Sequence, residues 1–225
     1  MPTVLKAILC DVDGVLVDTE DLQFQARDWI CREEGGKPLT HEEHTRIVGK
    51  DGMVTMQELS RMKGLVGDLI ELRDRCREKY IQLRRAGGIP VIEGNVRLIR
   101  EFANLPWGVR FVAVSSDSHD HIRENLQAAR LEDLFEFSIS GHSDGLKKKP
   151  APDMWWAAMK RLGVKAEECL AFEDTPVGVE SATGAGVRVV ALPSPTTASC
   201  SFPTAQMVIR PGERRDARDI LARLR

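Results

Sequence analysis

Short apolar runs alternate with helical patterns along most of the chain. The runs that are typical of buried strands occupy residues 4–10, 109–114, 135–139, 169–172 and 187–192. Stretches with the apolar spacing of a helix lie between the later runs, at residues 119–129, 152–162 and 176–185. Strands that alternate with helices of this length indicate right-handed βαβ units. The pattern predicts an α/β fold with a doubly wound, Rossmann-like parallel sheet, whose ligand site lies at the carboxyl ends of its strands.

One interval interrupts this alternation. A parallel crossover needs about a dozen residues, whereas residues 11–108 separate the first two apolar runs. Helical spacing fills much of that interval, most clearly at Leu65, Leu69, Leu72, Cys76, Tyr80 and Leu83. We predict a small helical domain at residues 19–88, inserted into an α/β core formed by residues 1–18 and 89–225. The alternative is that these helices pack directly on the sheet.

Composition narrows the class of protein. Of the 225 residues, 42% are hydrophobic and 29% charged, as in globular proteins, and the net charge of −2 gives no general attraction to nucleic acid or an anionic membrane. No apolar run approaches the roughly 20 residues that span a bilayer. The five cysteines form no C-x-x-C pair, and the amino terminus has no basic-then-apolar signal pattern. We expect a reduced, cytoplasmic protein that binds neither nucleic acid nor membranes.

Two segments near the carboxyl terminus have simpler interpretations. Residues 194–203 (SPTTASCSFP) predict a surface loop, because turn-forming and small polar residues dominate them. The basic tail, residues 214–225, predicts a solvated amphipathic helix rather than a binding patch.

Acidic residues follow two of the predicted strands. Asp11 and Asp13 come directly after the first, and side chains two apart in an extended segment point the same way. Glu173 and Asp174 end the fourth. Carboxylates gathered in this way make an all-oxygen site that suits Mg²⁺. The alternatives are a plain Asp-Gly turn in the first case and a helix cap at Thr175 in the second, and Thr175 can cap while Asp174 binds metal.

Hydroxyls and a lysine follow the other strands. The second strand ends at Ser115 and Ser116, and hydroxyl and N–H groups before a helix suit an anion. After the third strand comes KKKPAPD, in which two prolines keep Lys149 out of a helix. A fixed lysine neutralises charge on a phosphate and on a nearby carboxylate. The alternatives are ordinary capping of the next helix and three solvated lysines on a loop.

In chain order, DVDGVLVDTE, VSSDS, KKKPAPD and FEDTPVG resemble the four motifs of the haloacid dehalogenase superfamily. The nearest groups are its helical-cap (subfamily I) phosphatases and the β-phosphoglucomutase-like enzymes. The resemblance covers nearly the whole chain, including the place of the inserted domain, which would be the cap. It implies an enzyme, a phosphoric monoester hydrolase that uses Mg²⁺ and an aspartyl-phosphate intermediate.

The resemblance also implies a role for each matching residue. Asp11 would be the nucleophile, and Asp13 would be the general acid and then the general base. Ser115 and Lys149, with N–H groups near Ser116, would hold the phosphoryl oxygens.

The implied metal site uses the same strand ends. Its ligands would be Asp11, the backbone carbonyl of Asp13 and Asp174. Glu173 would either bind the metal as well or contact the residues that bind it and orient them.

The resemblance favours a small phosphorylated metabolite as substrate, with a sugar phosphate as the best class and Gln23 and Lys50 as cap contacts. The runner-up is a β-phosphoglucomutase-type phosphomutase. Where that mutase has a cap histidine and a cap arginine, this chain has Gln23 and Gly52, which favours a phosphatase. A dehalogenase or a phosphonate hydrolase would not keep an acid at Asp13. A non-catalytic binding module would typically have lost a motif acid, and none is lost.

Overall fold

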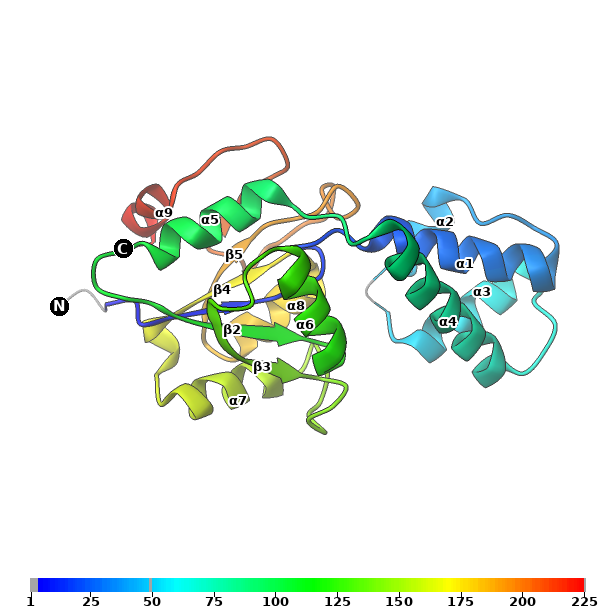
Figure 1. The fold of residues 1–225 in the computed structure, drawn as a ribbon, viewed down its shortest axis with the longest axis horizontal. Helices are drawn as coiled ribbons and strands as arrows, with labels where there is room; N and C mark the ends of the chain where they lie inside the picture. The colour runs from blue at the N-terminus through cyan, green and yellow to red at the C-terminus, as the bar shows by residue number, and fades with distance from the viewer. Residues whose placement is uncertain (1–3, 49, 225) are drawn as a thin grey trace. The chain divides into compact units, whose positions relative to one another are not determined.

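The computed structural model describes residues 4–48 and 50–224. Residues 1–3, where the sequence has no basic-then-apolar signal pattern, lie outside the described residues. The chain divides into two compact units (Figure 1). The larger is formed by residues 1–18 and 90–225, and the smaller by residues 19–89. Ile89, which the sequence placed with the core, belongs to the smaller unit.

The larger unit contains a six-stranded parallel sheet. Its strands are β1 (Ala7–Cys10), β2 (Arg110–Ser115), β3 (Phe135–Ser140), β4 (Cys169–Glu173), β5 (Arg188–Ala191) and β6 (Met207–Val208). They lie in the order β3-β2-β1-β4-β5-β6, with β1 paired to both β2 and β4. The predicted α/β fold with a doubly wound parallel sheet is confirmed. The two-residue strand β6 is an addition, because a strand that short leaves no apolar run in the sequence.

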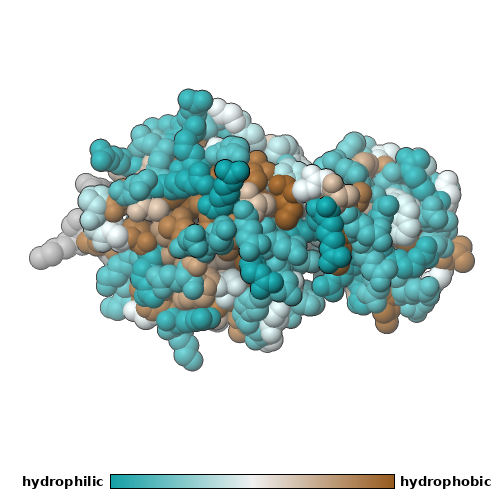
Figure 2. Space-filling view, viewed as in Figure 1, coloured by the Kyte–Doolittle hydropathy of each residue, from teal (hydrophilic) through white to brown (hydrophobic). Residues whose placement is uncertain are grey.

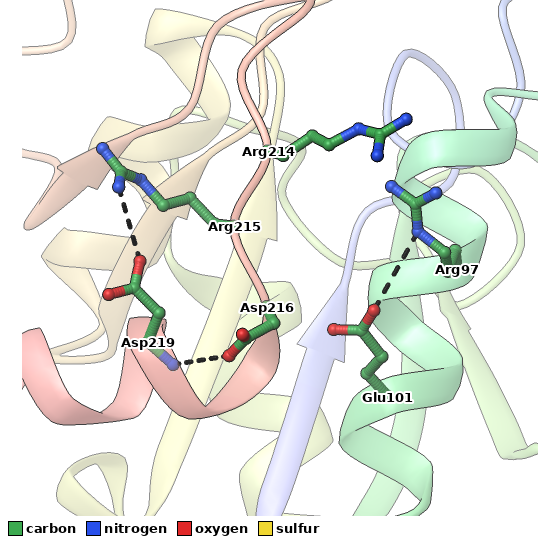
Figure 3. Close-up of a pocket in the computed structure, with 6 residues that line it drawn as sticks. All are labelled: Arg97, Glu101, Arg214, Arg215, Asp216 and Asp219. Atoms are coloured by element: carbon green, nitrogen blue, oxygen red, sulfur yellow. Dashed lines mark hydrogen bonds and ion pairs between the residues drawn. The ribbon is translucent and has the colours of Figure 1, made fainter.

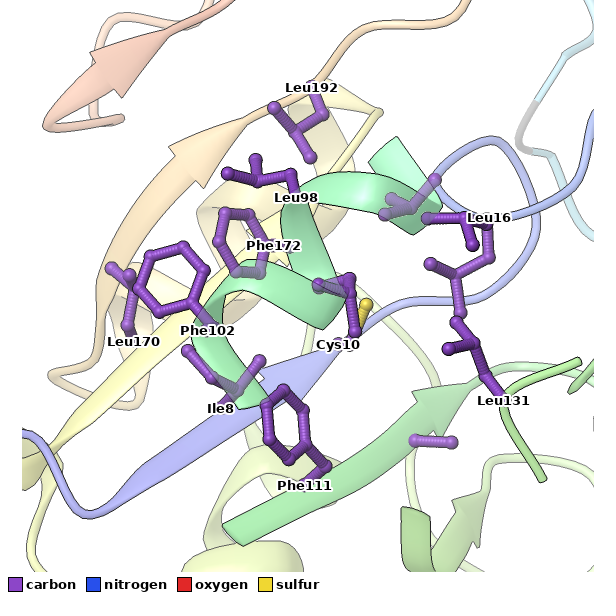
Figure 4. Close-up of a cluster of buried hydrophobic side chains, with 14 of the residues drawn as sticks. Ile8, Cys10, Leu16, Leu98, Phe102, Phe111, Leu131, Leu170, Phe172 and Leu192 are labelled. Atoms are coloured by element: carbon purple, nitrogen blue, oxygen red, sulfur yellow. The ribbon is translucent and has the colours of Figure 1, made fainter. Parts of the chain in front are cut away.

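Helices cover both faces of this sheet. They are α5 (Glu93–Ala103), α6 (His119–Ala128), α7 (Asp153–Leu162), α8 (Pro176–Gly184) and α9 (Ala217–Arg223), with a 3₁₀ turn η1 (Ala166–Glu168). Along β1 the side chains alternate: Ile8 and Cys10 pack with α5, α6 and α9, whereas Ala7 and Leu9 pack with α7 and α8. Figure 4 shows the first of these clusters, in which Phe102 of α5 meets Phe172 edge to face at 5.4 Å. Burial on both faces explains why β1 is continuously apolar.

The smaller unit is helical and has an apolar cluster of its own. Its helices are α1 (Glu20–Gly35), α2 (His41–Thr45), α3 (Gly52–Lys63) and α4 (Leu69–Gly87). Helix α1 packs against α4 and α3, and Ile30, Leu59 and Leu72 are buried among them. The buried Lys63 ammonium joins α3 to α2, since it donates to Glu43 Oε2 at 2.5 Å and to the Pro38 carbonyl at 2.8 Å.

Two segments of the larger unit lie side by side where the chain leaves it and returns. The Asp18 N–H donates to the Pro90 carbonyl, and the Ile92 N–H donates to the Leu16 carbonyl, each at 2.9 Å. Both ends of the inserted segment are therefore tied to the same short ribbon, immediately after the first acidic motif.

Polar side chains cover most of the face that Figure 2 shows. Among residues 4–48 and 50–224, none of the helices is both long and apolar enough to cross a membrane.

Candidate active site at the carboxyl ends of the strands

The site begins where β1 ends. The Asp11 N–H donates to the Phe172 carbonyl of β4 at 2.9 Å, which fixes Asp11 between these two strands. The chain then turns at Gly14, whose φ of +78° lies in the left-handed region that favours glycine. A Cβ at Gly14 would lie 2.0 Å from Asp174 Oδ2. Glycine at this position therefore serves both the turn and the close approach of the Asp174 carboxylate.

The order of the strands brings the two acidic motifs together. Strands β2 and β3 lie on one side of β1 and β4 to β6 on the other, so the order reverses between β1 and β4. Ligands bind at such switch points in doubly wound sheets. One ligand atom from each of Asp11, Glu173 and Asp174 lies within 4.8 Å of the others, and all three residues are buried.

Lys149 lies among these carboxylates. Its Nζ donates to Asp11 Oδ1 at 2.5 Å, to the Val114 carbonyl at 3.2 Å and to Glu173 Oε1. The ammonium lies over the ring of Trp155, 5.2 Å from the ring centroid. One lysine thus contacts the ends of β1, β2 and β4, which the alternative of a solvated loop lysine does not explain.

Two hydrogen bonds hold the segment that carries Lys149 in place. Trp155 is fully buried on α7 and its Nε1 donates to Ser181 Oγ of α8 at 2.9 Å. The Ser181 hydroxyl in turn donates to the Ala151 carbonyl at 2.6 Å. A buried network of this kind holds the chain rigidly, so the lysine position is set before any ligand arrives.

Both oxygens of Glu173 are engaged within the protein. Oε1 accepts from Lys149, and Oε2 accepts from the Asp174 N–H at 3.1 Å. The carboxylate rests on Gly178, where a Cβ would lie 2.0 Å from Oε2. Thr175 caps α8, because its Oγ1 accepts from the Gly178 N–H at 3.1 Å. The predicted cap is therefore present, and its acceptor is the hydroxyl of Thr175 and not the carboxylate of Asp174.

Residues 194–203 form the predicted loop, but only part of it lies at the surface. Ser194 and Thr197 are buried, at 2% and 4% exposure. Thr197 Oγ1 donates to the Asp174 carbonyl at 2.8 Å and accepts from the Ser194 N–H at 3.0 Å. The turn after β5 therefore holds the backbone of Asp174. The small polar residues of this loop do not predict that contact from the sequence.

Burial and charge act against each other in this cluster. Burial raises the pKa of Asp11 well above its ordinary value, Glu173 and Asp13 raise it further, and Lys149 opposes them. Burial alone would lower the pKa of Lys149, but the charges of Asp11 and Glu173 raise it above its ordinary value. Three buried carboxylates against one ammonium leave an excess of negative charge, which a cation would balance. The donor set is all oxygen and therefore fits a hard divalent ion such as Mg²⁺.

Ser115 is the last residue of β2, and Ser116 starts the turn that follows it. Ser115 is buried and Ser116 half-buried. Ser115 Oγ accepts from the Asp117 N–H at 3.1 Å. The cap of α6 is Ser118, whose Oγ accepts from the His121 N–H at 3.4 Å, so capping does not require the first two serines. The Lys149 bond to the carbonyl just before Ser115 sets this turn beside the carboxylates.

Asp13 follows the end of β1 by three residues and is half-buried. Its Oδ2 accepts from Asn125 Nδ2 at 3.1 Å. Asn125 is fully buried on α6, and the sequence analysis did not identify it. The available signal was an asparagine on the apolar face of a helix, next to Ile122 and Leu126.

Gln23 and Lys50 lie in the smaller unit, each in contact with neighbours there. Gln23 Oε1 accepts from Arg27 at 2.6 Å, and Arg27 lies 3.4 Å from His44 Nδ1. Lys50 Nζ lies 3.3 Å from Glu58 Oε1. The neutral Gln23 therefore has a guanidinium group beside it. The part of these residues in substrate selection stays a prediction, as does the role of the unit as a cap.

A cavity of about 630 Å³ lies elsewhere in the larger unit, between α5 and the approach to α9 (Figure 3). It is lined by Arg97, Glu101, Arg214, Arg215, Asp216 and Asp219. Its arginines and carboxylates are equal in number, and several pair with one another, as Arg215 and Asp219 do at 3.5 Å. The strand ends, where buried charge is unbalanced, are the better candidate site.

Comparison with known proteins shows which family the chain resembles. The sequence profile of haloacid dehalogenase-like hydrolases matches residues 8–192. The chain is 29% identical over 214 residues to the protein CbbY of Rhodobacter capsulatus, covering 89% of this chain and 91% of that protein. It is 30% identical over 188 residues to the phosphorylated carbohydrates phosphatase of Thermotoga maritima, covering 82% and 83%. The crystal structure of CbbY from Rhodobacter sphaeroides with xylulose-(1,5)bisphosphate has a TM-score of 0.76 and 25% identity, covering 92% and 94%.

Proposed function

Because the chain belongs to the haloacid dehalogenase-like hydrolase family and is an enzyme of the phosphatase type, we propose that it is a Mg²⁺-dependent phosphohydrolase working through an aspartyl-phosphate at Asp11. We propose small phosphorylated sugars as substrates, including ketose bisphosphates such as the ligand of the Rhodobacter sphaeroides protein. The observation that carries the proposal is the buried cluster in which Lys149 bridges Asp11 and Glu173 beside Asp174.

In the first step an Asp11 carboxylate oxygen attacks phosphorus and the bond to the sugar oxygen breaks. Asp13 gives its proton to that oxygen, so the sugar leaves as a neutral alcohol. Lys149, together with Ser115 and the N–H groups near Ser116, stabilises the charge on the phosphoryl oxygens. The charge of Lys149 lowers the pKa of Asp11 against the rise that burial causes, and so favours the ionised carboxylate.

In the second step water attacks the phosphorus of the aspartyl-phosphate. Asp13, now ionised, takes a proton from that water, and the bond between phosphorus and the Asp11 oxygen breaks. Inorganic phosphate leaves, Asp11 returns as a carboxylate and Asp13 is protonated again. Protons and charge therefore balance over the cycle with Asp13 alone as carrier.

Asp11, Asp174 and the carbonyl of Asp13 would hold Mg²⁺, with Glu173 behind them because both its oxygens already have protein partners. When bound, the ion would offset the negative charge of the carboxylates and the phosphate as they come together. Lys149 holds the side chain of Asp11 in position, and Thr197 holds the backbone of Asp174.

The test is magnesium-dependent release of phosphate from a panel of sugar phosphates and from 4-nitrophenyl phosphate. Asp11→Asn should abolish release from all of them, and mass spectrometry of acid-quenched wild-type enzyme should find the phosphate on the peptide that contains Asp11. Asp120→Asn is the matched control, because Asp120 is an exposed acid on α6. Full activity of Asp11→Asn would refute the covalent mechanism.

The phosphomutase alternative shares the first step and differs in the acceptor of the second. A hexose 1-phosphate incubated with enzyme, Mg²⁺ and a trace of sugar bisphosphate distinguishes them by phosphorus NMR. We expect free phosphate to accumulate. Accumulation of hexose 6-phosphate with little free phosphate would show that the sugar, and not water, receives the phosphoryl group.

A further inference from the structure

Asn125 contacts the acidic motif from a distant part of the chain. It lies on α6, 112 residues from Asp13, and its Nδ2 is 3.1 Å from Asp13 Oδ2. Its side chain is fully buried, on the face of α6 that also carries Ile122 and Leu126. Those neighbours belong to the apolar cluster between α6 and the sheet.

Packing alone does not account for an asparagine at this position. Burying a carboxamide in apolar surroundings is unfavourable unless it is hydrogen-bonded, and a leucine of similar size would pack there without that cost. The bond to Asp13 contributes to that compensation. The asparagine therefore provides a polar contact to the carboxylate opposite it that an apolar residue of the same helix face could not provide.

The chemistry of the carboxamide distinguishes the two oxygens of Asp13. The NH₂ group of asparagine can only donate, so Oδ2 must accept and does not carry a proton on the side that faces Asn125. The bond occupies one of the two lone pairs of Oδ2 and so fixes which way the carboxyl group faces. The same bond limits rotation of the carboxylate about its Cβ–Cγ bond.

We propose that Asn125 is a positioning residue for proton transfer: it holds the Asp13 carboxyl group at Oδ2 and so orients it for the exchange of protons with the leaving oxygen and with water. The inference rests on the proposed function, in which Asp13 is the general acid and base. It adds a residue outside the four motifs, carried by α6, to the machinery of that step.

The experiment compares substrates that differ in their need for a proton. Asn125→Leu removes the donor at similar size, and Asn125→Asp keeps the shape if the leucine variant does not fold. We expect kcat/KM for a sugar phosphate, whose leaving oxygen must be protonated, to fall about 10- to 100-fold, the order of loss that follows misplacement of a catalytic group. For 4-nitrophenyl phosphate, whose leaving group needs no proton, kcat/KM should change by less than about threefold.

Leu126→Val is the control, because it perturbs the same face of α6 next to Asn125 and leaves the donor to Asp13 in place. It should lower thermal stability and affect both substrates alike. Equal losses of the two substrates in both Asn125 variants would overturn the proposal and leave Asn125 a structural residue.

A double-mutant cycle separates this inference from the proposed function. In an Asp13→Asn background, Asn125→Leu should cause no further loss with the sugar phosphate, because the group it positions is already gone. A further loss as large as in the wild-type background would overturn the positioning role. If Asp13→Asn itself spares the sugar phosphate, the acid role of Asp13 fails, and with it the proposed mechanism.

Discussion

Replacing Lys149 with methionine removes the cation that lies between two buried carboxylates. Its Nζ is 2.5 Å from Asp11 Oδ1 and bonds Glu173 Oε1 as well, and the exposed fractions of the Lys149, Asp11 and Glu173 side chains are 9%, 8% and 0%. Methionine has a comparable length without the charge. Removing one partner of a buried ion pair costs about 3–5 kcal/mol. We expect the metal-free variant to lose about 3–5 kcal/mol of unfolding free energy.

The loss should grow with pH. Without Lys149, the pKa of Asp11, which burial already raises, rises further because the opposing charge is gone. A group with a raised pKa in the folded state contributes stability below its unfolded pKa, and that stability is lost as pH rises through the folded value. The variant should therefore differ from wild type more at about pH 8 than at about pH 5.

The assay is urea unfolding in excess chelator at both pH values, followed by circular dichroism. Lys147→Met is the matched control, because Lys147 is exposed in the same run of lysines, and it should stay within about 0.5 kcal/mol of wild type. A Lys149→Met protein as stable as that control at the higher pH would refute the argument. It would mean that Lys149 does not compensate the buried charge of Asp11 and Glu173.

Three other substitutions test separate parts of the structure. Gly14→Ala should raise the Mg²⁺ concentration for half-maximal activity at least about tenfold, because its Cβ would displace the Asp174 carboxylate; a Mg²⁺ titration measures this. Asp174→Ala should weaken metal dependence similarly, and full wild-type activity in excess chelator would contradict the metal site. Lys63→Met should raise the pKa of Glu43, which the Lys63 bond lowers to about 2, towards its ordinary value. An NMR titration detects that change, and the stability that Glu43 contributes should then be lost at a higher pH as pH falls.

The sequence by itself determined the sheet and the edge at which the chemistry gathers. Buried parallel strands are apolar along their whole length, so the runs ending at Asp11, Ser115 and Glu173 mark strands and their carboxyl ends without any knowledge of the fold. Because the carboxyl ends of parallel strands share one edge, polar motifs at those ends had to approach one another. The apolar spacing of the inserted segment likewise indicates helices from local pattern alone.

Only the tertiary structure decided which groups touch. The bond between Lys149 and Asp11 spans 138 residues and that between Asn125 and Asp13 spans 112. Such pairs depend on strand order, on helix rotation and on the space that Gly14 and its neighbours leave, none of which a local pattern encodes. Residues 194–203 show the same limit: their composition is that of a loop, and it does not indicate that Thr197 is buried against the Asp174 backbone. Local spacing reports which face of an element is apolar, whereas a contact between distant side chains is settled by how the elements pack.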